Sequence, residues 1–303
     1  MGPTSEEEMD QETSTKRISE DIYLHGLPSN TSKYPYTGLD GFWSSIEIER
    51  ARFYDDTDSG KSSEYVVFFN VNEENFAHDF DIARHKSSWQ LLNSYNPSTE
   101  ILLVKMPTTR DHERAHDSLT NLLIMKLAGM NDANLSLYWY GAADMRTPSR
   151  TKKPDQQFAP RYLPAGRSDE WPAMVMESGF SESDAQLDGD AKWWMKESKG
   201  QVRIVLAISV DRRKPEIVFR QWSPVSTSQS SSRVQIEPVL QQSVVVSKLL
   251  GQSAVNISNG PLTLPFSELF LRQPVKAQGE GDIVFSDTDL DIVAQMVWER
   301  QKF

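Results

Sequence analysis

The sequence predicts a mixed α/β (α+β) fold in which helices flank a central mixed sheet. Short runs of β-branched and aromatic residues recur along the chain and read as strands. Amphipathic helical stripes separate several of these runs. One run, Gln201 to Val210, is apolar at nearly every position, as in a strand covered on both faces. Strands that alternate with helices are typical of a sheet with helices packed on it.

The first hundred residues contain few regular patterns. Residues 1–20 combine six acids with two bases and show no apolar periodicity, so we expect a disordered acidic tail. Residues 21–62 mix aromatic residues with glycine, proline and serine, which favours irregular structure packed on a core. Glu64–Asn70 and Glu100–Met106 are apolar runs that predict strands.

Two helices are predicted in the middle of the chain. Thr108 and Asp111 have capping-box spacing, and an apolar stripe follows up to Gly129. Residues 135–141 and 173–177 predict the next strands. Ser183 and Gln186 repeat the capping-box spacing before a second apolar stripe that ends at Gly200. The strand at 201–210 then has a neighbour at 216–222.

The remainder of the chain predicts a β-rich extension. Ser223 to Ser232 is rich in serine and favours a linker or a long hairpin loop. Strand-like runs follow at 234–238, 243–248 and 261–264, and Asp289–Arg300 predicts a closing amphipathic helix. We therefore expect a tail (1–20), an α/β core (21–222) and an extension (223–303) packed on that core. A separate module at 223–303 that selects partners is the alternative.

Composition excludes several classes of protein. Of the 303 residues, 32 are Lys or Arg and 43 are Asp or Glu, a net charge of −11, which excludes a generally basic coat around nucleic acid. The absence of cysteine excludes disulfides, thiolate zinc sites and cysteine nucleophiles. No run approaches the roughly 18 apolar residues of a spanning helix, and the N-terminus is acidic where a signal peptide is basic. We expect an intracellular protein, cytoplasmic or nuclear, that is neither secreted nor membrane-bound.

Carboxylates at the ends of predicted strands indicate a site for a hard cation. Asp155 follows Pro154 at the start of a predicted strand, and Glu177 ends the 173–177 run. Two such carboxylates can hold Mg²⁺ or Mn²⁺, which polarises a phosphoryl oxygen and acidifies bound water. Glu113, from the preceding helix, is a candidate to complete the site, and Asp190 is a further candidate metal ligand.

This arrangement resembles the restriction-endonuclease-like PD-(D/E)XK superfamily, whose core has a helix, a strand with Pro-Asp, a strand with Glu-x-Lys, a helix and a strand. The segment 171–222 is also similar to a group of uncharacterised fungal proteins. Their shared pattern is Trp-Pro, an apolar run, Glu-x-Gly-x-Ser-Glu-Ser, paired aromatic residues on a helix, and a Val-x-Ile-Val strand. The resemblance covers residues 100–222. It implies a restriction-endonuclease-like core and magnesium-dependent phosphodiester hydrolysis.

One position departs from the superfamily pattern. Gly179 stands where the motif has its lysine, two residues after the acid. Some superfamily members place the lysine on the following helix, which makes Lys192 the substitute; Lys152 and Lys153 are weaker candidates. If none of them reaches Glu177, the fold survives without catalysis.

Each candidate also has a structural explanation. Asp155 after proline can satisfy N–H groups of a turn, Glu113 suits the first turns of a helix, and Lys192 can pair with Asp188 at i,i+4. His112 and His116 have the spacing of a metal pair, but with no matching third ligand we interpret them as packing or solvated residues. Trp193 and Trp194 are candidates for base stacking, and core packing is the better interpretation for Trp194.

Charge between residues 146 and 167 supports a nucleic-acid partner. This segment contains six bases and one acid. A basic strip beside metal-binding carboxylates can guide a phosphate backbone, although an ordinary exposed loop has the same composition. The residues predicted to contact nucleic acid are Arg150, Lys152, Lys153 and Arg161.

The leading hypothesis is a metal-dependent nuclease that cuts DNA in preference to RNA. Asp155 and Glu177 hold the metal, Glu113 assists and Lys192 attends the water. The alternative is a catalytically inactive nuclease-like fold that serves as a binding or interaction module, with a protein partner at the C-terminal region.

Overall fold

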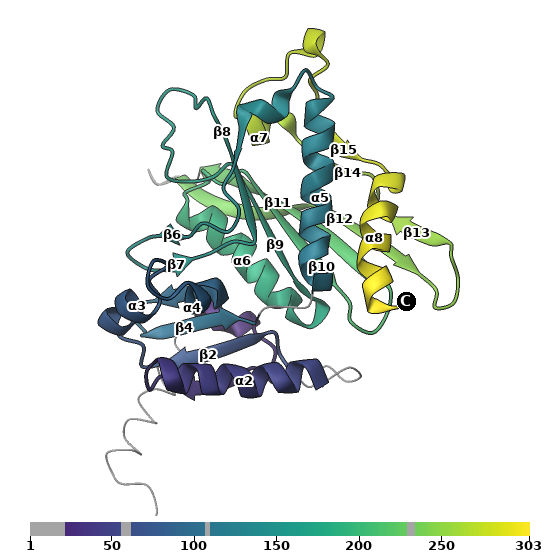
Figure 1. The fold of residues 1–303 in the computed structure, drawn as a ribbon. Coiled ribbons are helices and arrows are strands. Elements are labelled where there is room, and N and C mark those ends of the chain that lie inside the picture. Colours follow the sequence, from purple (N-terminus) through teal and green to yellow (C-terminus); the bar gives the residue numbers. More distant parts are fainter. Residues whose placement is uncertain (1–21, 56–61, 107–109, 229–233) are drawn as a thin grey trace, which may run out of the picture. The chain divides into compact units, whose positions relative to one another are not determined.

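The chain forms two compact units (Figure 1). The computed structural model describes residues 22–55, 62–106, 110–228 and 234–303. Unit 1 comprises Met1–Thr108 and Asp144–Lys153, and unit 2 comprises Thr109–Ala143 and Pro154–Phe303. The expected α/β class is confirmed, since the structure contains mixed sheets flanked by helices. The expected boundary between residues 222 and 223 falls inside a strand, and the acidic tail lies outside the described residues.

Unit 1 is built on a six-stranded sheet in the order β1-β2-β4-β3-β7-β6. The last two strands come from the inserted segment, residues 144–153. In chain order its elements are η1 (Ile22–Gly26), β1 (Ser32–Pro35), α2 (Leu39–Asp55), β2 (Tyr65–Phe69), α3 (Glu73–Asp79), α4 (Lys86–Leu91), β3 (Leu92–Asn96), β4 (Ile101–Lys105), β6 (Met145–Arg146) and β7 (Thr151–Lys152).

Helix α2 lies in a region where the sequence favours irregular structure. Its buried residues Phe42, Ile46 and Phe53 follow helical spacing, but the position between them is Glu49, also buried. Glu49 is satisfied there, because its Oε1 accepts hydrogen bonds from the Tyr34 hydroxyl at 2.5 Å and from Arg52 at 2.6 Å. A paired acid in the apolar stripe therefore explains why the pattern did not predict this helix.

Unit 2 is built on a seven-stranded sheet in the order β13-β12-β11-β10-β9-β8-β5. Strands β9 and β10 are parallel, and the other neighbours in this sheet are antiparallel. The elements are α5 (Arg110–Ala128), η2 (Ala133–Ser136), β5 (Leu137–Trp139), β8 (Gln156–Pro160), β9 (Met174–Phe180), η3 (Ser181–Ser183), α6 (Asp184–Glu197), β10 (Ile204–Val210), β11 (Glu216–Ser228), β12 (Val234–Lys248), β13 (Val255–Ser258), β14 (Leu262–Leu264), α7 (Phe266–Phe270), η4 (Lys276–Gln278), β15 (Ile283–Phe285) and α8 (Asp287–Gln301).

The serine-rich segment belongs largely to a long antiparallel pair. Residues 223–228 continue β11 and pair with residues 239 to 234 of β12. Residues 229–233 lie outside the described residues. The two strands expected at 234–238 and 243–248 form the single strand β12. Serine and threonine on an exposed strand satisfy the ladder as well as apolar residues do, so composition alone favoured a loop where a strand exists.

The expected helices are present, but the caps differ from the prediction. Ser183 is the N-cap of α6, yet its side chain makes no capping hydrogen bond. A capping box exists instead at Ser286, the N-cap of α8, where Asp289 receives hydrogen bonds from the Ser286 hydroxyl and amide. The expected cap of α5 lies outside the described residues. Among the described residues, no helix combines the length and the apolar character that a bilayer crossing requires.

Helix α8 packs beside α5 (Figure 1), and an ion pair joins them. Lys126 Nζ lies 2.7 Å from Asp289 Oδ2, and most of both side chains is buried. Burial alone would raise the pKa of Asp289, but the hydrogen bonds from Lys126 and Ser286 outweigh it and hold this pKa below its usual value. Asp289 therefore caps α8 and fastens it to α5 at the same time.

Replacing Asp289 with asparagine removes the charge from both contacts. We expect Asp289→Asn to lower the free energy of unfolding at pH 7 by about 1–2 kcal/mol. A depressed folded-state pKa stabilises the protein above the unfolded value and is lost as pH falls through the folded value. The difference between wild type and variant should thus be constant above about pH 5 and shrink below about pH 4 in urea titrations. Asp287→Asn, an exposed first-turn acid of the same helix, is the control; an equal, pH-independent loss in both variants would contradict the assignment.

Candidate functional site

Of the predicted site residues, Glu177 lies on β9, and Asp155 directly precedes the neighbouring antiparallel strand β8. The pairing of β8 with β9 ends at Gln156 opposite Met176. The next position on each strand in this register is Asp155 and Glu177. Pro154 before Asp155 lacks the N–H that a continued ladder requires, so β8 begins after it. The structure therefore brings the backbones of these two residues to opposing positions at one end of β8, but their carboxylates make hydrogen bonds on opposite faces of β9.

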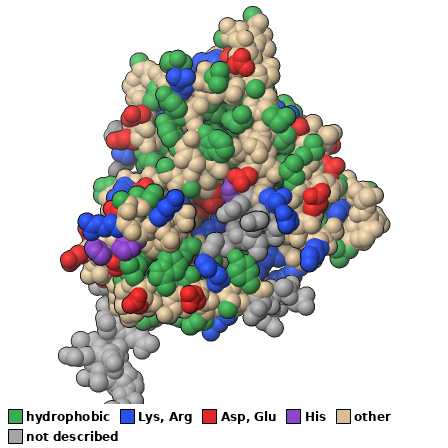
Figure 2. Space-filling view, in the orientation of Figure 1, with side chains coloured by type: hydrophobic (Ala, Val, Ile, Leu, Met, Phe, Trp, Pro, Cys, Tyr) green, Lys and Arg blue, Asp and Glu red, His purple; other side chains and the backbone are tan. Residues whose placement is uncertain are grey.

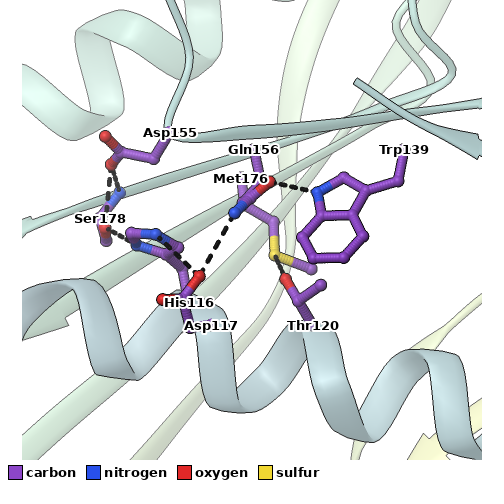
Figure 3. A network of polar contacts seen from close by, with 8 residues as sticks. All are labelled: His116, Asp117, Thr120, Trp139, Asp155, Gln156, Met176 and Ser178. Atoms are coloured by element: carbon purple, nitrogen blue, oxygen red, sulfur yellow. Dashed lines mark hydrogen bonds and ion pairs between the residues drawn. The ribbon is translucent and has the colours of Figure 1, made fainter. Parts of the chain in front are cut away.

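Asp155 is fixed by a chain of hydrogen bonds that reaches helix α5 (Figure 3). Its Oδ2 accepts from the backbone N–H of Ser178 at 2.7 Å and from the Ser178 hydroxyl at 2.9 Å. The Ser178 Oγ lies 2.8 Å from Nδ1 of the buried His116. Because the single hydroxyl proton of Ser178 goes to Asp155, Nδ1 of His116 is the donor to Ser178. His116, for which we expected packing or solvation, is thus a buried support of the site.

This order of groups excludes a serine nucleophile of the usual kind. In a nucleophilic triad the imidazole lies between the hydroxyl and the acid and accepts the hydroxyl proton. Here the hydroxyl lies between, and its proton is donated to the carboxylate. Ser178 is therefore a positioning residue for Asp155.

The same network continues along α5 to the edge of the sheet (Figure 3). Gln156 Nε2 donates to Asp117 at 3.4 Å, and Gln156 Oε1 accepts from the Trp139 indole N–H. Asp117 also lies 3.5 Å from Nε2 of His116. Side chains of β5, β8, β9 and α5 are therefore linked around Asp155.

Glu177 is held by the other helix of the sheet. It is 1% exposed, and its Oε1 accepts a 2.7 Å hydrogen bond from the indole N–H of Trp194 on α6. Consecutive strand residues point to opposite faces, so Glu177 faces α6 while Ser178 faces α5. Trp194 is fully buried, which confirms core packing for this residue.

Asp190 lies one helical turn before Trp194 and is also fully buried. Its Oδ1 accepts a 2.9 Å hydrogen bond from the Gln186 amide. Since residues at i and i+4 share one face of a helix, Asp190 and Trp194 both point from α6 toward the sheet. The α6 face of β9 thus contains two buried carboxylates, Glu177 and Asp190.

Carboxylate oxygens suit a hard divalent cation, but the three candidates do not converge as one ligand cluster: among the described residues, the group of three ligating side chains that lies within 4.8 Å is His78, Asp79 and His85. Asp155, Glu177 and Asp190 offer carboxylate oxygens, the ligands that Mg²⁺ and Mn²⁺ prefer. Each carboxylate accepts at least one hydrogen bond, at Oδ2 of Asp155, Oε1 of Glu177 and Oδ1 of Asp190. The structure places Glu177 and Asp190 on the α6 face of β9 and ties Asp155 to Ser178, which faces α5.

Lys192 lies away from Glu177. It is exposed on α6, and its Nζ lies 5.6 Å from the centre of the Trp222 ring of β11. Lys192 is two residues before Trp194, so their side chains point about 160° apart around the helix axis. Lys192 therefore lies on a different side of α6 from the side that contacts Glu177. The fourth predicted catalytic residue, Glu113, has a side chain outside the described ones.

Helix α6 is tied to β11 by a shared arginine. Arg220 contacts Asp184 at 2.9 Å and Asp188 at 3.1 Å. Burial raises the pKa of Asp188, although the nearby Arg220 and Lys192 charges act in the opposite direction. Asp188, the alternative partner considered for Lys192, is therefore an ion-pair partner of Arg220.

The four residues predicted to contact nucleic acid have different environments. Arg150 is 5% exposed and donates to Ser94 Oγ at 3.3 Å, and Lys152 is fully buried. Lys153 donates to the carbonyl oxygens of Trp89 and Gln90. These three lie in unit 1 as parts of its interior or its own hydrogen bonding. Only Arg161 among the four is exposed.

Arg161 belongs to an exposed aromatic group that the sequence analysis did not single out. Its guanidinium lies 5.6 Å from the Tyr138 ring centre and 6.0 Å from that of Tyr162. The rings of Tyr138 and Tyr140 lie 5.7 Å apart at the edge strand β5. We call Tyr138, Tyr140, Arg161 and Tyr162 the aromatic edge. Its three tyrosines are 43%, 52% and 74% exposed. The sequence signal for this surface is the Tyr-Trp-Tyr run at 138–140, which we interpreted as part of a strand without expecting its side chains to be exposed.

Comparisons with known proteins add no family. No family model matches this chain, and no curated protein matches it significantly.

Removing the Ser178 hydroxyl should disturb both residues that it joins. We expect Ser178→Ala to lower the free energy of unfolding by about 1–3 kcal/mol, because the buried His116 donor loses its acceptor and Asp155 loses one of two donors. Chemical denaturation measures the loss. Ser209→Ala is a matched control, since this buried serine lies beside Gly179 on β10 and the described residues supply no hydrogen bond to its hydroxyl. A loss no greater than in this control would contradict a bridging role.

Proposed function

We propose that the protein is a metal-dependent phosphodiesterase that hydrolyses nucleic acid, DNA in preference to RNA. The observation that supports this most is the opposition of Asp155 and Glu177 at one end of β8, with Asp190 buried on the Glu177 side. Buried carboxylates are costly unless they are paired or bind a metal. Glu177 and Asp190 are both buried in this way, and Asp155 beside them is half-buried.

The order of elements in unit 2 supports the same proposal. Helix α5 is followed by β5, by β8 with Pro-Asp before it, by β9 with Glu177, by α6 and by β10. The superfamily that the sequence resembles has this order of helix, Pro-Asp strand, glutamate strand, helix and strand.

In this proposal each residue has a defined task. When bound at these carboxylates, Mg²⁺ or Mn²⁺ polarises a phosphoryl oxygen and makes the attacking water more acidic. Asp155 and Glu177 are the proposed ligands, with Asp190 as a third, and metal binding must draw the Asp155 carboxylate from Ser178 toward the α6 side of β9. Ser178 and His116 orient Asp155, and Trp194 orients Glu177. No task is assigned to Lys192, because it lies over Trp222.

The aromatic edge provides a surface for the nucleic acid itself. Exposed aromatic rings stack on unpaired bases, and an arginine beside them adds a cation–π and a phosphate contact. Large exposed aromatic side chains on an edge strand otherwise favour aggregation. Because stacking requires unpaired bases, we propose that the strand bound there is single-stranded or locally opened.

A second candidate function is supported by one specific observation. Gly179 stands at the motif lysine, and the substitute Lys192 lies away from Glu177. A phosphodiesterase without a group to attend the attacking water is slow or inactive. The second candidate is therefore a catalytically inactive module of this fold that binds nucleic acid, or a protein partner through the C-terminal region.

Cleavage assays separate the two candidates. With Mg²⁺ or Mn²⁺ we expect wild-type protein to cut single-stranded DNA, and Asp155→Asn or Glu177→Gln to lower the rate by about 100-fold or more, because each removes one ligand charge. Lys192→Ala should retain the rate within about twofold, and Asp169→Asn, an exposed loop acid, is the charge-matched control. Thermal unfolding verifies that each variant is folded. A folded wild type that cuts neither DNA nor RNA with either metal would refute the enzyme and leave the binding module.

Binding to the aromatic edge is measured separately from cleavage. We expect Tyr138→Ala and Tyr162→Ala each to weaken binding of a fluorescent oligothymidylate, in EDTA, by about tenfold, since one stacked base contributes roughly 1–3 kcal/mol. Tyr54→Ala removes a tyrosine of unit 1 that is 45% exposed and serves as the control. Anisotropy titrations that give equal affinities for all four proteins would show that this surface does not bind the strand.

A further inference from the structure

Unit 1 contains a cluster of metal-ligating side chains that is independent of the carboxylates in unit 2. One ligand atom from each of His78, Asp79 and His85 lies within 4.8 Å of the other two. His78 and Asp79 end helix α3, and His85 directly precedes helix α4. In Figure 2, histidine side chains (purple) reach the surface where Figure 1 shows α3. The sequence analysis missed this group, because its only sequence signal is a His-Asp pair with a second histidine six residues later.

We propose that His78, Asp79 and His85 form a binding site for a divalent transition metal, with Zn²⁺ as its best-matched ion. Two imidazole nitrogens and one carboxylate suit Zn²⁺, and a site with three protein ligands leaves a fourth position for water or a further ligand. The surface exposure of His78, whose side chain is 61% exposed, gives the ion a path to the site.

The backbone around the cluster is held rigidly. Asp81 caps the connecting turn, since its Oδ1 accepts from the N–H groups of Ala83 and Arg84. The Ser88 hydroxyl oxygen lies 2.6 Å from the carbonyl oxygen of Asp79 and 2.9 Å from that of His85, so its single proton is shared between the two acceptors. Ser88 thus holds the backbone of two ligand residues in place. The conformational entropy of this backbone is therefore lost when the protein folds and not when a metal binds.

A second observation concerns the orientation of the carboxylate. Asp79 is largely buried, and its Oδ2 accepts a 2.5 Å hydrogen bond from the Tyr36 hydroxyl. Burial and the neighbouring Asp79 charge raise the pKa of Tyr36, so it remains a hydrogen-bond donor. The other oxygen, Oδ1, lies 2.6 Å from Nδ1 of His78. Asp79 is thus fixed through Oδ2 while Oδ1 faces His78, and a hydrogen bond from an outer residue orients ligands in the same way in metal sites.

Little movement separates this cluster from a tetrahedral site. Neighbouring ligand atoms of tetrahedral Zn²⁺ lie about 3.3 Å apart, given metal–ligand distances near 2.0 Å. His78 Nδ1 and Asp79 Oδ1 must therefore separate slightly and lose the proton that they share, while His85 moves inward. The ring centres of His78 and His85 already lie 5.7 Å apart. His78 is exposed and His85 is half-buried, and rotation of these two side chains supplies the shifts.

Calorimetric titration of the full chain with ZnCl₂ tests the site. We expect one Zn²⁺ per chain and a rise of about 3 °C in Tm at saturating metal. His78→Ala and His85→Ala should each abolish this binding. Tyr36→Phe should keep the stoichiometry and weaken the affinity about 10–100-fold, as loss of an outer hydrogen bond to a ligand does. The visible spectrum of the Co²⁺ form reports tetrahedral coordination in wild type and its loss in the histidine variants.

The control is His25→Ala, which removes an exposed histidine outside the cluster and should leave affinity unchanged. Absence of zinc binding by folded wild type would overturn the proposal. Equal affinity in wild type and the two cluster histidine variants, or an equal loss in His25→Ala, would also overturn it. The site is distinct from the carboxylates of unit 2, so a negative cleavage assay does not affect this test.

Discussion

The polar residues of a fully buried strand impose the main constraint on unit 2. Every residue of β9 is buried, yet the strand contains Glu177 and Ser178 side by side. Polar groups removed from water require partners, and the alternation of the strand directs these two to opposite faces. Trp194 satisfies Glu177 from α6, and His116 satisfies Ser178 from α5. The two helices that cover the sheet are therefore positioned by hydrogen bonds as well as by apolar packing.

This constraint relates the fold to the candidate site. A core of apolar residues alone would allow α5 and α6 to slide, since hydrophobic contact has little directional preference. A buried indole or imidazole must meet its partner within hydrogen-bond distance, which fixes the rotation and the height of each helix. The same bonds orient Asp155 and Glu177 before any ligand binds. The hydrogen bonds that fix the two helices thus also fix both carboxylates.

The strands at 65–69, 101–105 and 204–210 and three long helices could be predicted because their apolar patterns are uninterrupted, whereas short strands such as β1, β3, β6 and β7 were not predicted. The strand at 204–210 and the helix that ends at Ala128 follow directly from such patterns. Prediction failed where a polar residue occupies an interior position with a partner from elsewhere, as Glu49 does in α2. It also failed at Ser183, since spacing alone does not reveal whether a hydroxyl turns toward the helix end. The Ser223–Ser228 strand shows that composition describes side chains but not backbone pairing.

The candidate site was predictable only in part, for a related reason. Strand ends locate Asp155 and Glu177, because apolar runs define where strands stop. The direction of Lys192 depends on the rotation of α6, which Trp194 and Arg220 determine through distant partners. Likewise, the basic residues at 150–153 read as a surface strip, but two of them are buried. Charge along a sequence does not report exposure when the segment belongs to a sheet.

The insertion of residues 144–153 into unit 1 affects the order of events during synthesis. Unit 1 needs β7 beside β3 and β6 beside β7 to complete its sheet. During translation, β5 and all of α5 emerge from the ribosome before these strands do. Domains generally fold as units while the chain is elongated. The edge of β3 therefore stays unpaired until residues 144–153 have been synthesised. During that interval a chaperone or a second nascent chain has access to this edge.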